Sequence, residues 1–167
     1  MTASETSPTD SAPSPWTHPP FAVIAVAFAL VISLAGAALA AYLVYENVRG
    51  EAGVCVIAHG CSTVQNSRYG SIGGVPVSVP GLALYLALAL LAALWLRNSL
   101  LGRANLAALA VYGSLFGVLF SMSLTYIEAF VLDAWCIYCI VSAILVSALF
   151  LIWGGLLAAG MRRARSQ

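Results

Sequence analysis

Four long apolar segments constrain this chain more than any other feature of its sequence. They span residues 21–45, 79–96, 106–127 and 135–161, and none of them contains Asp, Glu, Lys or Arg. An α-helix needs about 20 apolar residues to cross a bilayer, where lipid offers no partner to an unpaired backbone group. The whole chain is 62% hydrophobic and 8% charged, against about one quarter charged in soluble domains. We therefore predict an all-α integral membrane protein, a bundle of four transmembrane helices.

The regions outside the four spans are short or polar. Residues 1–20 are rich in Ser, Thr and Pro and contain neither Lys nor Arg, which is typical of a disordered tail. Residues 162–167 form a basic tail, so residues 21–161 are expected to be one membrane domain. The formal net charge of +1 provides no field that would attract nucleic acid.

The arginines predict how the chain is oriented in the membrane. Four spans place both termini on one side, where the flanking arginines number five against two on the opposite side: Arg97, Arg103, Arg162, Arg163 and Arg165 against Arg49 and Arg68. Basic residues accumulate in cytoplasmic loops. We expect both termini in the cytoplasm, in a multi-pass protein of the cell inner (plasma) membrane. The first span taken alone favours the opposite orientation, because no arginine precedes it and Arg49 follows it. We base the orientation on the arginine count of all flanking segments.

A Cys-x-x-Cys motif, Cys136 and Cys139, lies where the fourth span begins. Helical spacing puts both side chains on one face. Unpaired N–H groups at a helix N-terminus stabilise a thiolate and lower the pKa of a cysteine. The motif alone is equally compatible with a structural disulfide. Asp133 precedes it and either caps the helix or handles protons for the dithiol; the sequence leaves both open.

A second cysteine pair, Cys55 and Cys61, lies in the connection between the first two spans. The predicted orientation puts all four cysteines at the periplasmic or exterior face, where disulfides form and exchange. We expect electrons to pass from a partner thiol through Cys55 and Cys61 to Cys136 and Cys139, and then to a quinone in the lipid. His59 is more often an exposed loop residue than a base for Cys61. We expect no metal site.

The loop and the last span also carry several motifs in a fixed order. These are Cys55-x5-Cys61-Ser62, Asn66-Ser67-Arg68-Tyr69-Gly70, Gly73-Gly74-Val75-Pro76-Val77, Pro80-Gly81, Tyr85 and Cys136-Ile137-Tyr138-Cys139. With this order of motifs and four helices, the chain from about residue 21 onward resembles the vitamin K epoxide reductase family, specifically its bacterial members.

The resemblance implies a four-helix bundle around a quinone (ubiquinone or menaquinone), with the outer loop capping the quinone site. It implies that Cys55 exchanges with a thioredoxin-like (DsbA-like) protein, that Cys61 passes electrons to Cys136, and that Cys139 faces the quinone. The net reaction would oxidise the thiol protein, reduce the quinone and support disulfide-bond formation.

Further details of the site follow from the same resemblance. Ser67 matches a family serine near the quinone, and we expect it to contact the quinone together with Asn66 and Cys139. Many bacterial relatives carry a fused thioredoxin-like domain, whereas this chain ends at Gln167, so we expect a separate periplasmic partner. Vertebrate enzymes have a tyrosine where this chain has Ala143, so quinone contacts at that depth do not carry over.

Three rival interpretations remain to be separated from this one. A non-enzymatic membrane protein would hold two structural disulfides, Cys55–Cys61 and Cys136–Cys139, that do not turn over. A DsbB-type quinone-linked oxidase has the two cysteine pairs in the reverse order. A metal transporter needs acidic or histidine ligands within its spans, and the four predicted spans contain none.

Overall fold

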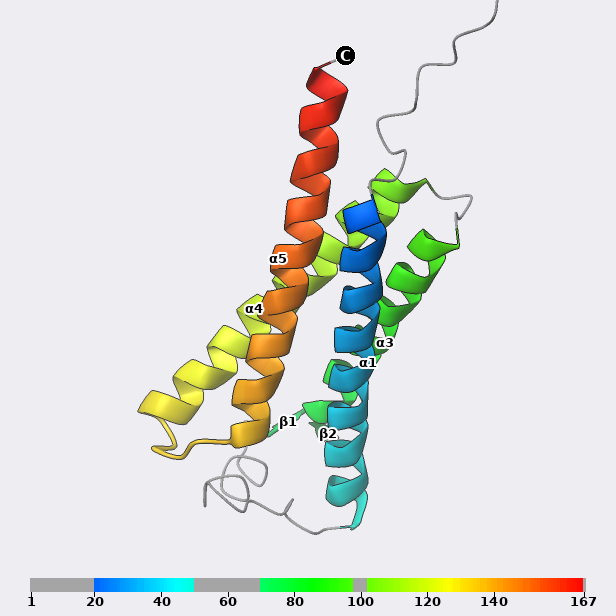
Figure 1. The fold of residues 1–167 in the computed structure, drawn as a ribbon. Coiled ribbons are helices and arrows are strands. Elements are labelled where there is room, and N and C mark those ends of the chain that lie inside the picture. Colours follow the sequence, from blue (N-terminus) through cyan, green and yellow to red (C-terminus); the bar gives the residue numbers. More distant parts are fainter. Residues whose placement is uncertain (1–19, 50–69, 98–101, 167) are drawn as a thin grey trace, which may run out of the picture.

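Four long helices and one short β-hairpin make up the computed structural model, which describes residues 20–49, 70–97 and 102–166 (Figure 1). The helices are α1 (Pro20–Arg49), α3 (Ser78–Leu96), α4 (Arg103–Phe130) and α5 (Ile137–Arg165). Each contains most of one predicted apolar segment and is long and apolar enough to cross a membrane. The prediction of a four-helix membrane bundle is confirmed.

The helices extend beyond three of the predicted spans, because backbone hydrogen bonds continue past the first charged residue. Helix α1 continues to Arg49, and α4 continues to Phe130. The predicted end of the third span at residue 127 is therefore wrong, since the next residue, Glu128, lies in the last turn of α4. Helix α5 begins at Ile137, directly after Cys136, and runs on to Arg165.

The β-hairpin was not predicted. Strand β1 (Ser71–Ile72) pairs antiparallel with β2 (Val75–Pro76), and Ser71 lies opposite Pro76. The turn between the strands is formed by Gly73 and Gly74, whose φ angles are 60° and 85°. Two successive residues with positive φ are what a two-residue hairpin turn requires, and glycine adopts them without steric cost.

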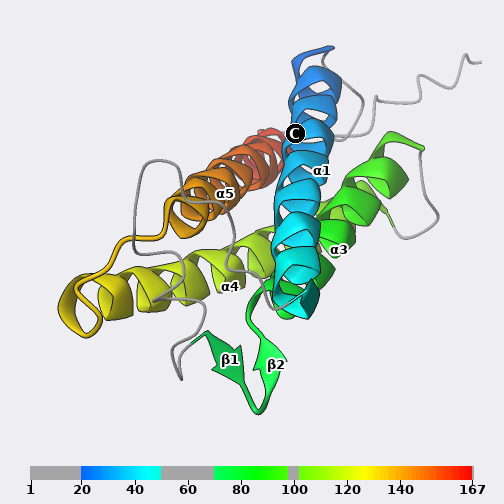
Figure 2. The same ribbon diagram turned by 90° about the horizontal axis from the view of Figure 1, so that it is seen from below.

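The helices alternate in direction, so the bundle has two distinct ends. At the end that we call the terminal end, α1 begins and α5 finishes, and Arg163 lies over the ring of Phe21 at 5.6 Å (Figure 1). At the opposite end, which we call the hairpin end, the β-hairpin adjoins the start of α3 (Figure 2). Helix α1 packs mainly against α3, and α4 against α5. The turn between α4 and α5 also lies at the hairpin end.

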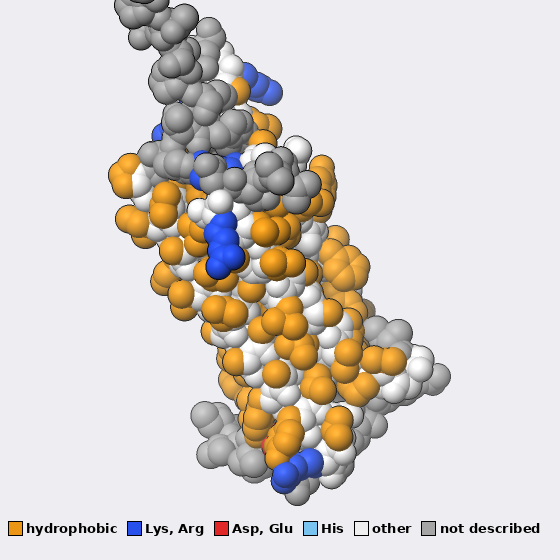
Figure 3. All heavy atoms as spheres, turned by 90° about the vertical axis from the view of Figure 1, so that its right-hand side faces the viewer, with side chains coloured by type: hydrophobic (Ala, Val, Ile, Leu, Met, Phe, Trp, Pro, Cys, Tyr) orange, Lys and Arg blue, Asp and Glu red, His pale blue; other side chains and the backbone are white. Residues whose placement is uncertain are grey.

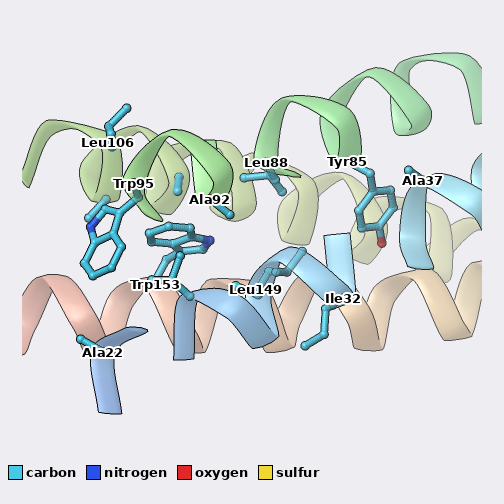
Figure 4. Packing of buried hydrophobic residues seen from close by; sticks show 14 of the residues in the cluster. Ala22, Ile32, Ala37, Tyr85, Leu88, Ala92, Trp95, Leu106, Leu149 and Trp153 are labelled. Atoms are coloured by element: carbon cyan, nitrogen blue, oxygen red, sulfur yellow. The ribbon is translucent and has the colours of Figure 1, made fainter. Parts of the chain in front are cut away.

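Buried apolar side chains hold the bundle together along its length. Trp153 and Leu149 of α5 and Leu88 and Trp95 of α3 form the bulky part of this core, and Tyr85 lies toward its hairpin end (Figure 4). Hydrophobic side chains also cover the middle of the outer face that Figure 3 displays, and basic side chains gather toward the two ends. Such an apolar belt suits a surface that faces lipid.

Gly113 and Gly117 of α4 have the spacing of a small-xxx-small helix-packing site. A Cβ atom at Gly117 would lie 2.6 Å from Val146 Cγ2 and 2.8 Å from Leu84 Cδ2, so α5 and α3 both approach this glycine closely. At Gly113 the nearest atom, Leu88 Cδ2, would be 3.5 Å away, an ordinary contact. Gly117 is therefore the position of the pair at which the helices pack closely.

We predict that Gly117→Ala destabilises the bundle relative to Gly113→Ala, its matched control one turn away. Both changes give α4 the same gain in helix propensity, but only the first forces Val146, which is stiff at χ1, to move. Overpacking of this kind costs about 1–3 kcal/mol. Thermal unfolding in detergent measures the difference, and equal melting temperatures for the two variants would contradict it.

Candidate redox site

The turn between α4 and α5 is held by the last groups of α4. The N–H groups of Val131 and Leu132 both donate to the carbonyl of Ile127, each at 3.0 Å. The N–H of Ala134 donates to the Glu128 carbonyl at 3.1 Å. These bonds satisfy carbonyl groups that the end of a helix would otherwise leave unpaired. They fold the chain back so that α5 begins beside the end of α4.

Cys136 is the N-cap residue of α5, with an extended backbone conformation. Its carbonyl accepts hydrogen bonds from the N–H groups of Cys139 and Ile140, both at 3.1 Å. The predicted placement of the Cys-x-x-Cys motif at a helix N-terminus is confirmed. The hypothesis that Asp133 caps this helix is wrong, because Cys136 occupies the cap position and Asp133 lies three residues earlier, with a φ of 47°.

Both thiols of the motif are free in the structure, Cys136 fully buried and Cys139 partly buried. The hydrogen bond from the Cys139 thiol is the largest cause that lowers the pKa of Cys136 to about 7. The backbone N–H groups of Tyr138 and Cys139 act in the same direction, whereas burial and the charge of Glu128 oppose it. Near neutral pH the pair therefore holds a substantial fraction of thiolate, the form that attacks disulfides.

Glu128 completes the site, and the sequence reasoning missed it. Its side chain is 1% exposed, and its Oε2 accepts a hydrogen bond from the Cys136 N–H at 3.1 Å. Its Oε1 is buried without a hydrogen-bond partner among the described residues. An acidic residue directly after the apolar run ending at Ile127, eight residues before Cys136, was the signal that could have identified it.

The sulfur atoms of Cys136 and Cys139 and a carboxylate oxygen of Glu128 all lie within 4.8 Å of one another. Thiolates and a carboxylate are also donors that Zn²⁺ accepts. A bond between the two sulfurs would remove two of the three donors, and the two cysteine pairs together, at an oxidising membrane face, predict a disulfide that exchanges. We therefore assign no metal ligand here and interpret the cluster as a dithiol with an adjacent carboxyl group.

A cavity of about 120 Å³ opens beside the cluster, lined by residues of all four helices and of the hairpin segment. Its wall is mainly aliphatic and aromatic, and it includes Glu128, Cys136 and Cys139. Tyr85 also lines it; its hydroxyl donates to the Ser142 carbonyl and pairs with the Ser142 hydroxyl, each at 2.9 Å.

The cavity fits a quinone ring in size and in chemistry. Its volume is of the same order as the ~150 Å³ cavity that admits benzene in another protein. An apolar wall with a few placed polar groups is the usual character of a small-molecule site. Here the polar side chains of the wall include Asn47, Glu128 and Ser142.

The other predicted site residues, Cys55, Cys61, Asn66 and Ser67, lie outside the described residues, as does His59. Of the residues predicted to form the site, the structure thus brings Cys136 and Cys139 together, and it adds Glu128. The contribution of the first loop stays a prediction.

Comparison with known families gives one match. A model described as "Vitamin K epoxide reductase family" matches residues 27–153, from the middle of α1 into α5, including both cysteines of the motif. No curated protein matches the chain.

We predict that the reduced Cys55→Ser/Cys61→Ser protein forms thiolate with a midpoint near pH 7. A free cysteine titrates near ~8.5, and the Cys139 thiol is the main cause that lowers the pKa of Cys136 to about 7. Adding Cys139→Ala removes that cause, so the midpoint should move to higher pH. Thiolate absorbance in the ultraviolet measures both, and equal midpoints with and without Cys139 would refute the assignment.

Proposed function

Because this chain belongs to the vitamin K epoxide reductase family, whose members are in general quinone-linked thiol oxidoreductases, we propose that it reoxidises a periplasmic thioredoxin-like (DsbA-like) protein and reduces a membrane quinone. The activity would support disulfide-bond formation. The observation that carries the proposal is the position of Cys136 and Cys139, on the wall of an apolar cavity between four helices long enough to span a membrane.

The first half of the reaction is thiol–disulfide exchange. A thiolate of the partner attacks the Cys55–Cys61 disulfide at Cys55, and a second partner thiolate then releases it, leaving both loop cysteines reduced. The Cys61 thiolate attacks a Cys136–Cys139 disulfide at Cys136, and Cys139 leaves as a thiolate. Cys55 resolves the mixed disulfide and regenerates the loop disulfide, so that two electrons now reside on the Cys136–Cys139 dithiol.

The second half reoxidises that dithiol. A bound quinone supplies the oxidising power, taking up two electrons and two protons to become a quinol. The wall of the cavity would hold its ring, and we propose that Asn66 and Ser67 of the loop contact it together with Cys139. Ubiquinone and menaquinone both present the ring that this chemistry needs.

We also propose that the hairpin end faces the periplasm and that both termini are cytoplasmic. Among the described residues, the arginines support this orientation. Arg97 ends α3 and Arg103 begins α4. The last turn of α5 adds three arginines at the same terminal end, while Arg49 lies at the hairpin end. An excess of basic residues marks the cytoplasmic side.

We predict quinone-dependent oxidation of a reduced thioredoxin-like protein by the purified full chain. Cys136→Ala and Cys139→Ala should each reduce quinone reduction to background, because each removes one sulfur of the inner pair. Cys55→Ala should mainly block exchange with the partner. Ser123→Ala, an exposed position on α4 whose hydroxyl donates to the Leu119 carbonyl, is the control that should retain full turnover.

Two outcomes of that experiment would overturn the proposal. Steady turnover in Cys139→Ala would reject the assigned order of the cysteines. Two disulfides that persist through the assay while no thiol is oxidised would instead support the alternative, a non-enzymatic membrane protein with structural disulfides Cys55–Cys61 and Cys136–Cys139.

The orientation has its own test. A reporter that is active only in the cytoplasm, fused after Gln167, should be active, and a reporter that requires the periplasm should be silent at the same position. The reverse result would place the cysteines in a reducing compartment, where this thiol oxidation would not be sustained.

A further inference from the structure

Glu128 is buried where a carboxyl group is costly to place. It lies in the last turn of a helix long and apolar enough to span a membrane, and only 1% of it is exposed. Among the described residues, no arginine, lysine or histidine lines the cavity on which it lies. An ionised group without a cation partner is unfavourable in such surroundings, and an ionisable residue in a membrane segment commonly marks a function.

The two oxygen atoms of this carboxyl group have different surroundings. Oε2 is held by the Cys136 N–H at 3.1 Å, and Oε1 has no partner among the described residues. The carboxyl group lies within 4.8 Å of both thiols. A proton acceptor needs to come within about 3 Å of its donor or to act through one water molecule. A carboxylate oxygen within 4.8 Å of both sulfurs is near enough for proton transfer through one water molecule.

The proposed reaction needs a proton acceptor at this point. When Cys136 and Cys139 become a disulfide, two S–H bonds break, one S–S bond forms, and two electrons and two protons leave. Among the described residues, the titratable side chains of the cavity wall other than Glu128 and the two cysteines are Tyr85 and Tyr138. The Tyr85 hydroxyl is already bonded to Ser142 on the next turn of α5. Glu128 is the one carboxyl group among the described residues of the wall.

We propose that Glu128 accepts, one at a time, the protons released by the Cys136–Cys139 dithiol as the pair is oxidised. The inference rests on the proposed function, in which the two electrons reduce a quinone and that quinone also takes up two protons. Glu128 alternates between carboxylate and carboxylic acid and returns each proton toward the cavity. Its bond to the Cys136 N–H keeps it beside the thiols throughout the cycle.

The variant that tests this role is Glu128→Gln. Glutamine keeps a carbonyl oxygen for the Cys136 N–H, so the turn between α4 and α5 should fold as before, but the amide cannot take up a proton. Glu128→Asp keeps the carboxyl group at a shorter reach. Glu46→Gln is the matched control, because Glu46 is also a buried carboxyl group of a spanning helix, α1, but does not line the cavity.

In rapid mixing of reduced protein with quinone, Glu128→Gln should slow dithiol oxidation by about 10²-fold or more, the usual loss for a proton-transfer group. Glu128→Asp should recover part of the rate, and Glu46→Gln should match the wild type. A Glu128→Gln protein that is oxidised at the rate of the wild type would overturn the proposal.

A second measurement needs no quinone. The Cys55→Ser/Cys61→Ser protein is oxidised and reduced electrochemically, and infrared difference spectra are recorded. Time-resolved spectra after oxidation should show a transient carbonyl band of a protonated carboxyl group, which decays as Glu128 passes its proton on. The band should be absent in Glu128→Gln and present in Glu46→Gln. The same band in Glu128→Gln, or no such band in any protein, would reject the role. Failure of quinone-dependent turnover in the wild type would reject the proposed function, whereas this spectrum tests the role of Glu128 independently of turnover.

Discussion

The absence of hydrogen-bonding solvent in the bilayer core governs this structure. A backbone in lipid must satisfy its own N–H and C=O groups, which restricts each apolar segment to one continuous helix. Reactive groups that need an irregular backbone or a charge are consequently found where the helices end. The Cys-x-x-Cys motif, the turn 131–136 and the hairpin all lie at one such end, around the mouth of an apolar cavity.

At that end, the last turn of α4 and the first turn of α5 build the site together. Helix α4 closes the turn with its free carbonyls and contributes Glu128, which takes the Cys136 N–H. Helix α5 contributes the two sulfurs with the spacing of its first turn. The hydrogen bond between the Cys136 N–H and Glu128 therefore has two effects. It satisfies a buried backbone donor, and it places a carboxyl group next to the dithiol.

The parts of this arrangement that depend on local pattern were predictable from the sequence. Charge-free apolar runs identified the four helices, and Cys136 and Cys139 were expected at a helix start. The location of Glu128 was not, because a span defined by uncharged residues ends at Ile127, whereas the helix ends where its hydrogen bonds end. The Gly73-Gly74 pair carried the information for the hairpin turn, but strands of two residues leave no periodicity to detect. The choice of Cys136 over Asp133 as the cap depends on how the turn closes against α4, which is tertiary information.

Tyr85 closely packs one wall of the cavity, so that wall leaves little space for a larger ligand. Its ring from α3 lies so close to Gly36 of α1 that no side chain fits there, and its hydroxyl is tied to Ser142 of α5. Tyr85 thereby connects α1, α3 and α5 at one wall of the cavity. Its contact on α5 is the helical turn that follows Cys139. Added volume on this wall would disturb contacts of three helices at once, including the helical turn of α5 that follows Cys139.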